Sequence, residues 1–256
     1  MSIAIITGAS SGIGAEFARK LSAFADEFWF VARREDRMIA LGEELGVKYK
    51  AFSADLTTSE GISAITDALK AEKPSVKYLV NAAGFGDFGA FDELPESSFT
   101  RMIDLNVKAL VCITHAVIPY MERGGRIIEL GSGSAFTPLP YFNVYASTKA
   151  FVLHYTKALK YEIKKYGVTA TCFCPGWVDT EFIGKAVEGG GTASPKASAL
   201  KPLLNCEKVV RGCIKAANRG KTVYATGKFT RLQSFLYRIA PHGVLSRTWI
   251  KMIGRK

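Results

Sequence analysis

The stretch "TGASSGIG", Thr7 to Gly14, follows an apolar run at the start of the chain and decides the fold. Its glycines at positions 8, 12 and 14 permit a tight turn, a close approach of a ligand to the backbone and a close contact between helix and strand. The helix expected after the turn would offer unpaired backbone N–H groups to a pyrophosphate. Glycines also serve ordinary turns, but a Gly-rich turn between a predicted strand and a predicted helix favours a dinucleotide-binding site.

The rest of the chain alternates strand-like apolar runs with segments of helical period, which is typical of βα units around a parallel sheet. Phe17, Ala18, Leu21 and Phe24, for example, recur at helical spacing and would face such a sheet. The pattern predicts one α/β domain over residues 1–256: a doubly wound Rossmann fold with a seven-stranded parallel sheet, helices on both faces and a C-terminal helical extension. The expected strands are Ile3–Thr7, Glu27–Ala32, Lys48–Ser53, Tyr78–Asn81, Gly125–Gly131, Val168–Cys174 and Thr222–Ala225.

The composition is that of an ordinary globular protein, since 48% of the 256 residues are hydrophobic and 22% are charged. No apolar run is expected to approach the ~18 residues of a membrane-spanning helix. The first residues lack the basic segment and cleavage site of a signal peptide, so a cytoplasmic location is predicted. The five cysteines form no CxxC pair and the three histidines lie apart in the sequence, so no metal site is expected.

The segment "YASTK", Tyr145 to Lys149, predicts acid–base chemistry. Residues at i and i+4 share one face of a helix, so the phenol and the ammonium group can lie side by side. A nearby positive charge favours phenolate and would lower the tyrosine pKa from ~10, which makes Tyr145 a usable acid or base. By itself such a pair usually means a packed ring beside a solvated amine, so the prediction depends on the other motifs. The upstream hydroxyl of Ser132 can both donate and accept a hydrogen bond, which suits a carbonyl that becomes an alcohol.

These motifs resemble the classical short-chain dehydrogenase/reductase family. The first stretch matches its TGxxxGxG motif, "NAAG" at 81–84 matches its NxAG motif, and "CPGWVDT" at 174–180 matches its PGxVxT segment. The resemblance covers residues 1 to about 225. It implies a nicotinamide-dependent oxidoreductase, assembled as a homodimer or homotetramer.

The resemblance also assigns parts of the cofactor to these motifs. The backbone of the NAAG motif would pass the adenosine side, Asp55 would bond the adenine amino group, and Val178 and Thr180 would meet the nicotinamide carboxamide. The cofactor-binding residues implied in this way are Gly8, Ser10, Ser11, Gly12, Ile13, Gly14, Arg33, Arg34, Asp55, Leu56, Asn81, Ala82, Gly84, Tyr145, Lys149, Pro175, Gly176, Val178 and Thr180.

The catalytic residues implied by the resemblance are Asn106, Ser132, Tyr145 and Lys149. Tyr145 would exchange a proton with the substrate oxygen held by Ser132, Lys149 would bond the ribose hydroxyls, and Asn106 would hold a proton-passing water. Where the family commonly has SSxAG, this chain has "GSGSA", which leaves Ser134 as a competing hydroxyl; spacing favours Ser132. The alternative is a cofactor-binding scaffold or redox sensor without turnover, but the retained proton-transfer residues favour an enzyme.

The stretch "VARRED", Val31 to Asp36, bears on the cofactor. In a dinucleotide fold a carboxylate at the end of the second strand binds the ribose 2′-hydroxyl and repels a 2′-phosphate. Ala32 stands where NAD-preferring members of the family place that acid, and Arg33 stands where NADP-preferring members place a base. A guanidinium can hold phosphate through two charge-assisted hydrogen bonds, so we predict NADP(H). Arg34 would add a second contact or pair with Glu35 or Asp36.

The substrate is predicted from aromatic residues around the expected cleft. The segment 180–202 lines that cleft in the family, and its glycines at 189–191 would suit a mobile lid, although disorder is an equal alternative. An apolar substrate is expected, such as a steroid, a 3-oxoacyl chain or an aromatic ketone. The candidate substrate residues are Ser134, Tyr141, Phe142, Trp177 and Phe182.

The C-terminal tail carries the whole positive charge excess. The net charge is +11, and residues 208–256 hold 12 Lys and Arg with no Asp or Glu. Two basic amphipathic helices are expected over about 228–256. They could lie on an anionic membrane surface, bind an acidic partner, cover a substrate channel, or pack on this subunit or a neighbour. No recognition motif accompanies the charge, so no nucleic-acid partner is expected.

Overall fold

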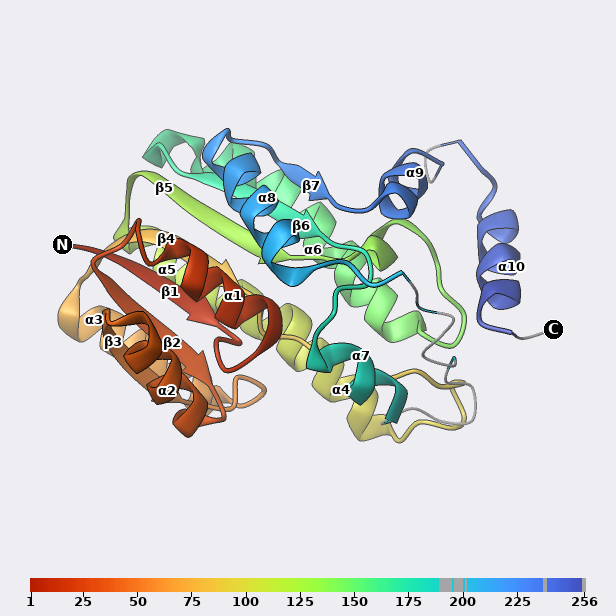
Figure 1. Cartoon of the computed structure of the whole chain (residues 1–256), viewed down its shortest axis with the longest axis horizontal. Helices are drawn as coiled ribbons and strands as arrows, with labels where there is room; N and C mark the ends of the chain where they lie inside the picture. Colours follow the sequence, from red (N-terminus) through yellow and green to blue (C-terminus); the bar gives the residue numbers. More distant parts are fainter. Residues whose placement is uncertain (189–194, 196–199, 201, 237–238, 255–256) are drawn as a thin grey trace.

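The computed structural model describes residues 1–188, 195, 200, 202–236 and 239–254. Its centre is a seven-stranded parallel sheet in the order β3-β2-β1-β4-β5-β6-β7 (Figure 1). The Rossmann fold and the seven predicted strands are confirmed, with small differences at the strand ends. The strands are β1 (Ser2–Thr7), β2 (Glu27–Ala32), β3 (Lys48–Ser53), β4 (Ser75–Asn81), β5 (Met121–Leu130), β6 (Thr169–Cys174) and β7 (Val223–Ala225).

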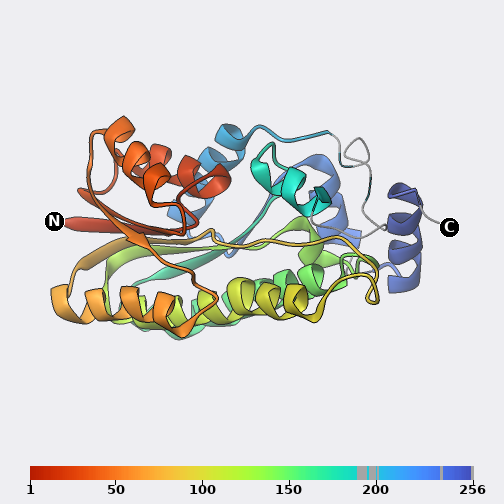
Figure 2. The ribbon, with the colours of Figure 1, turned by 90° about the horizontal axis from the view of Figure 1, so that it is seen from below.

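Helices cover both faces of the sheet because successive residues of each strand point to opposite faces (Figure 2). Ala4 and Ile6 of β1 pack in the cluster that holds α1, α2 and α8, while Ile3 and Ile5 pack in the cluster that holds α3 and α5. Burial on both faces explains why the strands are almost continuously apolar. The helices are α1 (Gly12–Leu21), α2 (Glu35–Leu45), α3 (Ser59–Glu72), α4 (Glu96–Ile103), α5 (Leu110–Val117), α6 (Asn143–Glu162), α7 (Glu181–Glu188), α8 (Cys206–Asn218), α9 (Lys228–Leu236) and α10 (His242–Met252), with the short helical segments η1 (Asp104–Ala109), η2 (Ile118–Tyr120), η3 (Gly133–Phe136) and η4 (Ile163–Tyr166).

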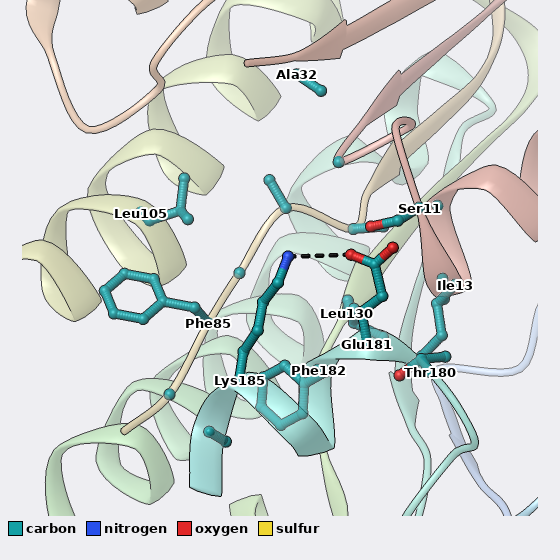
Figure 3. Close-up of a pocket in the computed structure, with 18 of the residues that line it drawn as sticks. Ser11, Ile13, Ala32, Phe85, Leu105, Leu130, Thr180, Glu181, Phe182 and Lys185 are labelled. Carbon is teal, nitrogen blue, oxygen red and sulfur yellow. Dashed lines mark hydrogen bonds and ion pairs between the residues drawn. The ribbon is translucent and has the colours of Figure 1, made fainter. Parts of the chain in front are cut away.

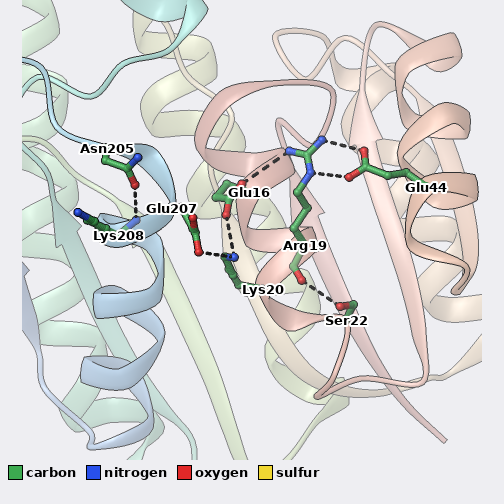
Figure 4. A network of polar contacts seen from close by, with 8 residues as sticks. All are labelled: Glu16, Arg19, Lys20, Ser22, Glu44, Asn205, Glu207 and Lys208. Atoms are coloured by element: carbon green, nitrogen blue, oxygen red, sulfur yellow. Dashed lines mark hydrogen bonds and ion pairs between the residues drawn. The ribbon is translucent and has the colours of Figure 1, made fainter.

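Polar contacts on the outer side of α1 tie it to its two helical neighbours (Figure 4). The guanidinium of Arg19 donates two hydrogen bonds to the carboxylate of Glu44 on α2, at 2.7 and 2.9 Å. Lys20 donates to Glu207 on α8 at 2.9 Å. Each of these exposed ion pairs contributes little to the free energy of folding. Together they connect α1, the helix after the glycine turn, to α2 on one side and α8 on the other.

The glycine turn is shaped by the backbone that passes beneath it. Gly8 has a φ of +71° and Gly12 a φ of +54°, a left-handed conformation that favours glycine. A Cβ on Gly8 would lie 2.8 Å from the backbone nitrogen of Ala83, where the chain leaves β4. The turn therefore lies directly against the carboxyl end of β4. Ligands of this type of fold bind at the carboxyl ends of the strands.

No apolar run as long as a membrane-spanning helix is expected from the sequence, and the helical stretch Glu96–Tyr120 (α4, η1, α5 and η2) differs from that expectation. It is long and apolar enough to cross a membrane by length and composition, the one such helix among the described residues. In the fold its apolar side chains instead join two core clusters, Ile113 and Val117 beneath β4 and β5 and Leu110 against α6. Its apolar character is that of a helix packed on a sheet.

The C-terminal extension is present as α9 and α10 at one end of the molecule (Figure 1). Trp249 and Ile253 are buried in a cluster with Phe88, Phe142 and Tyr145, and the indole nitrogen of Trp249 donates to the carbonyl of Pro140 at 2.8 Å. The apolar side of α10 thus packs on its own subunit, which is one of the alternatives left open by the sequence.

Candidate active site

A cavity of about 500 Å³ lies at the carboxyl ends of the strands and runs from the glycine turn to α6. Parallel strands end at this edge, so residues from distant parts of the chain meet there. The structure brings most of the predicted site residues together around this one space. Figure 3 shows part of its wall, with Ser11, Ile13, Thr180 and Phe182 among the predicted residues. The predicted residues that line it are Gly8, Ser10, Ser11, Gly12, Ile13, Gly14, Arg33, Arg34, Asp55, Leu56, Ala82, Gly84, Ser132, Tyr145, Lys149, Pro175, Gly176, Trp177, Val178, Thr180 and Phe182.

The glycines of the first turn fit a dinucleotide. A Cβ on Gly14 would overlap the carbonyl of Gly8, and a Cβ on Gly12 would lie 3.3 Å from Thr180. The turn can therefore pack this closely on itself and on Thr180 only because side chains are absent at these positions. The N-terminus of α1 lies at the same turn and offers its free N–H groups to an anion.

Two arginines, Arg33 and Arg34, line the end of the cavity beside the glycine turn. We call this the adenosine end, because the family resemblance places the adenosine of the cofactor there. Arg34 donates to the hydroxyl of Ser11 at 2.7 Å and forms an ion pair with Glu181 at 3.0 Å. Arg34 does not pair with Glu35 or Asp36, the alternative raised from the sequence, because these acids occupy the first turn of α2 and favour its positive end. Among the residues that the structure describes, no carboxylate lies within ion-pair distance of Arg33.

Ser132, Tyr145 and Lys149 meet at the other end of the cavity. Tyr145 and Lys149 project from one face of α6, as their spacing predicts, and both side chains are almost fully buried. Ser132, which precedes η3 after the end of β5, lies beside the Tyr145 phenol and acts to lower its pKa. The ammonium group of Lys149 donates to the carbonyl of Leu130 at 2.7 Å and lies 5.6 Å from the centre of the Tyr145 ring.

Burial dominates the protonation of this pair. It raises the pKa of the Tyr145 phenol well above its usual range, against the opposing effect of the Ser132 side chain. Burial also lowers the pKa of Lys149, to about 8. The expectation that Lys149 lowers the pKa of Tyr145 is wrong in this structure, because the ammonium faces the Leu130 carbonyl. A phenol with a raised pKa stays protonated near neutral pH, so Tyr145 is suited to donating a proton.

Asn106 lies behind the cavity rather than on its wall. It sits in η1, a π-helical segment, and is fully buried. Its amide nitrogen donates to the carbonyl of Phe85 at 2.9 Å and to the hydroxyl of Thr148 at 3.1 Å, and its amide oxygen accepts from the nitrogen of Phe85. Asn106 therefore fixes the loop after β4 to α6, one position from Lys149.

Four other predicted residues do not line the cavity. The amide of Asn81 points into the core and donates to Thr114 and Glu129, so only its backbone lies near the site. Ser134 is buried and donates to the hydroxyl of Ser132 at 2.7 Å. Phe142 stacks on the Tyr145 ring at 4.4 Å, and Tyr141, which has a φ of +65°, packs against the same cluster. The glycines at 189–191 lie outside the described residues.

Sequence reasoning missed several residues of the cavity wall. Glu181 and Lys185 lie one helical turn apart on α7 and form an ion pair at 3.0 Å, so the i, i+4 spacing of opposite charges was the available signal. Phe85 and Leu105 also line the cavity, close in sequence to the NAAG motif and Asn106. Among the described residues, no three His, Cys, Asp or Glu side chains are grouped so that they could hold a metal ion.

Comparison with known proteins agrees with this geometry. Residues 2–189 match the family model described as short chain dehydrogenase. The chain belongs to the short-chain dehydrogenase/reductase family. This short-chain dehydrogenase/reductase is an oxidoreductase, and the glycine turn and helix N-terminus described above fit the nicotinamide cofactor of that family.

Relatives of this short-chain dehydrogenase/reductase include sulfoacetaldehyde reductase 2 of Chromohalobacter salexigens, 36% identical over 70% of this chain and 74% of that protein. An 11-beta-hydroxysteroid dehydrogenase of Pinus massoniana is 29% identical over 96% of this chain and 72% of its own. A solved short-chain dehydrogenase from Sphingobium yanoikuyae, in complex with NADPH, superposes with a TM-score of 0.81 at 29% identity and covers 96% of this chain and 95% of its own. The bulky-bulky ketone specific alcohol dehydrogenase from Comamonas testosteroni superposes with a TM-score of 0.77 at 26% identity, covering 96% and 94%.

Proposed function

We propose that this protein is an NADP(H)-dependent oxidoreductase that interconverts a carbonyl and a secondary alcohol on a largely apolar substrate. The observation that carries the proposal is the meeting of Ser132, Tyr145 and Lys149 at one end of a cavity whose other end is a glycine cradle. A scaffold that only binds the cofactor would need the cradle but not a serine and a tyrosine together on the wall of the same cavity.

The mechanism assigns one task to each side chain. When bound, the nicotinamide supplies or accepts the hydride at the substrate carbon. Ser132 holds the substrate oxygen by a hydrogen bond, and Tyr145, kept protonated by burial, gives its proton to that oxygen during reduction. Lys149 places a positive charge near the Tyr145 ring and would hold the ribose hydroxyls of the bound cofactor. Asn106 keeps α6 in place through Thr148.

Replacing Tyr145 by Phe tests the mechanism. The variant keeps the ring but loses the proton donor, so we expect kcat for ketone reduction to fall by about 10²- to 10⁴-fold while the cofactor still binds. NADPH oxidation with a panel of apolar ketones measures the effect. Tyr161→Phe is the matched control, because Tyr161 lies on the same helix and is 78% exposed.

Equal rates in the Tyr145→Phe variant and the wild type would refute this mechanism. Tight cofactor binding by a wild type that turns over no member of the panel would favour the alternative of a scaffold or redox sensor.

The preference for NADP(H) is proposed from the charges around the adenosine end. Ala32 lines the cavity where an acid would repel a 2′-phosphate, and Arg33 and Arg34 line it beside the glycine turn. The solved relative from Sphingobium yanoikuyae, which is described in complex with NADPH, supports this assignment.

Arg33→Ala should raise the Michaelis constant for NADPH and leave that for NADH nearly unchanged, because only NADPH has the 2′-phosphate. Steady-state kinetics with both cofactors measures this ratio, and Arg123→Ala, an exposed change near the start of β5, is the control. An unchanged ratio in the Arg33→Ala protein would remove the basis for the preference.

The wall near Tyr145 supports an apolar substrate such as a steroid, a 3-oxoacyl chain or an aromatic ketone. Trp177, Phe182 and Phe85 line this part of the cavity with Ile183 and Ala186. Aromatic and aliphatic walls with few polar groups favour apolar ligands. The bulky ketones of the Comamonas enzyme and the hydroxysteroids of the Pinus enzyme, as their names describe, agree with such a wall.

The surface of α9 supports a peripheral contact with an anionic membrane. Thr230 is buried and Gln233 donates to Thr137, so the side of α9 that faces the protein is polar. Phe229, Leu232 and Phe235 are instead 55–60% exposed, which is the reverse of a helix packed on its own core. With the basic residues of the tail around them, they fit a bilayer that carries acidic lipids. We propose a cytoplasmic protein, a homodimer or homotetramer, that binds such a surface.

A further inference from the structure

Glu181, the first residue of α7, directs its carboxylate into the adenosine end of the cavity toward Ser11 (Figure 3). Three cations share this carboxylate. Arg34 lies 3.0 Å from it, Lys185 lies 3.0 Å from it, and Arg37 pairs with its second oxygen. Glu181 thus reaches from α7 across the cavity to residues at the start of α2.

These partners keep Glu181 ionised. Hydrogen bonds from Arg37, Lys185 and Arg34 lower the pKa of its carboxyl to about 2. The carboxylate is a fixed negative charge at every pH at which the enzyme would work. A negative charge here is unexpected beside a site for a phosphate.

Arg34 is the residue through which Glu181 and a 2′-phosphate would meet. Its guanidinium also donates to the hydroxyls of Ser10, at 3.3 Å, and Ser11, at 2.7 Å, and so lies against the glycine turn. Only Nη1 of Arg34 donates to Glu181, while Nε and Nη2 face the two serine hydroxyls. A phosphate that takes two N–H donors of Arg34 must therefore displace Glu181 from Nη1 or the serines from Nε and Nη2. The two anions would also repel each other at this distance, so only one of them can hold Arg34 fully.

We infer that Glu181 is a specificity-determining residue that competes with the cofactor 2′-phosphate for Arg34. It weakens the binding of NADPH and leaves the binding of NADH unchanged, so it narrows the preference that Arg33 and Arg34 create. The inference rests on the proposed use of NADP(H). Under this inference, the preference for NADPH over NADH depends on the two arginines that follow β2 and on Glu181 of α7, which lie far apart in the sequence.

The same contact connects the cofactor site to the reaction centre. Phe182 follows Glu181 directly, and its ring lies 5.5 Å from the ring of Tyr145. Ile183 and Ala186 of α7 are buried against the same aromatic cluster. When a phosphate takes Arg34 from Glu181, the first turn of α7 loses one of its anchors beside Tyr145.

Direct binding measurements test the inference without any substrate. We would titrate the purified protein with NADPH and with NADH and follow cofactor fluorescence. Glu181→Gln should lower the Kd for NADPH by about two- to fivefold, the range for an exposed ion pair, and leave the Kd for NADH unchanged. Glu188→Gln, the same change in charge at the exposed end of α7, should alter neither constant.

A double-mutant cycle shows whether the effect passes through Arg34. In an Arg34→Ala background, Glu181→Gln should have much less effect on NADPH binding, because the group for which the anions compete is gone. An unchanged or higher Kd for NADPH in Glu181→Gln would overturn the inference, as would equal gains for both cofactors. A wild type that binds NADH as tightly as NADPH would refute the proposed cofactor preference, whereas the response of Glu181→Gln by itself decides the competition.

Discussion

Lys149 and Tyr145 show how burial, more than proximity, sets the chemistry of single residues in this site. Their side chains are nearly inaccessible to water, and desolvation is the largest cause of both pKa shifts. Desolvation favours the neutral form of each group, so the phenol keeps its proton and the ammonium loses its proton more easily. Reduction needs the protonated phenol, whereas alcohol oxidation needs phenolate.

The pH dependence of the reaction should reflect these shifts. Below about pH 8 Lys149 is cationic, and above it the positive charge beside Tyr145 is lost. We expect kcat/KM for reduction to fall as the pH rises through about 8, because the phenolate that forms when Tyr145 gives up its proton loses this neighbouring positive charge. Pre-steady-state or initial-rate profiles of the reduction measure this. In Lys149→Arg, where the cation does not titrate, the fall near pH 8 should disappear from the residual activity.

Glu129 is a buried acid outside the cavity that bears on stability. It lies in β5 opposite Asn81 of β4, and it accepts hydrogen bonds from Thr114 at 2.9 Å and from Asn81 at 3.1 Å. Full burial raises its pKa to about 7 despite these bonds. The folded protein therefore binds a proton at Glu129 that the unfolded chain releases at a lower pH.

The sign of the effect follows from the raised pKa. The stabilisation by the Glu129 proton is complete below the unfolded pKa of about 4.5 and is lost as the pH rises to about 7, a total of about 3 kcal/mol. Glu129→Gln does not titrate. We expect the free energy of unfolding of the variant, relative to wild type, to rise by roughly 2 to 3 kcal/mol between pH 5 and pH 8.

Urea unfolding at the two pH values measures this difference. Glu43→Gln, an exposed change on α2, is the control and should show no such rise. If the free energies of unfolding of wild type and Glu129→Gln differed by the same amount from pH 5 to pH 8, Glu129 would be ionised in the folded protein over that whole range.

At the scale of elements, the glycine turn forms one end of the cavity and α6 forms the other. The N-terminus of α1 and the turn before it lie at one end of the cavity, and one face of α6 carries Tyr145 and Lys149, the proposed proton-transfer pair. The loop after β4 runs between them and is held by Asn106. The site is therefore built on rigid elements, which suits a reaction that needs fixed distances between hydride donor, substrate and acid.

The outward apolar side of α9 predicts binding to anionic vesicles. Phe229→Ser with Leu232→Ser should abolish co-sedimentation with vesicles of phosphatidylcholine and phosphatidylglycerol, because these side chains supply the buried area. Replacement of Lys228 and Arg231 by Gln should weaken binding about fivefold per charge at low salt, and less at high salt. Phe91→Ser, which removes another exposed aromatic side chain from a distant loop, is the control.

Sedimentation equilibrium of the same variants distinguishes the membrane from a second subunit. If wild type ignored the vesicles and the α9 double variant lowered the molecular mass toward the 27.8 kDa of one chain, α9 would be a subunit contact instead. An interface between identical patches would bring like charges together, which is why we favour the bilayer.

At the scale of the whole molecule, the aromatic cluster joins segments that the sequence keeps apart. Phe88 stacks on Phe142 at 3.8 Å, and Trp249 of α10 lies within 6.5 Å of both Phe88 and Trp177. The cluster closes the end of the molecule beyond Tyr145 and links the extension to the reaction centre. Sequence periodicity predicted the two terminal helices, but it could not say which of them would pack and which would remain exposed.

Much of the site was predictable because it depends on local order along the chain. The strands, the glycine turn and the α6 spacing follow from short-range patterns, and most of the predicted cofactor residues line one cavity. The pKa of Tyr145 was not predictable in direction, since it depends on burial by Phe142 and Phe182 from other segments. The ion pair between Arg34 and Glu181 was not predictable either, since it joins residues 147 positions apart.

The sequence by itself determined the doubly wound fold, the position of the glycine turn and the shared helix face of Tyr145 and Lys149, because each depends on apolar periodicity or on spacing within a short segment. Only the tertiary structure decided which groups are desolvated, that Glu181 holds Arg34, and that α10 packs while α9 exposes its apolar side. Burial and pairing between distant segments depend on how the elements assemble, and electrostatic free energies depend on that burial far more than on the order of residues in the chain.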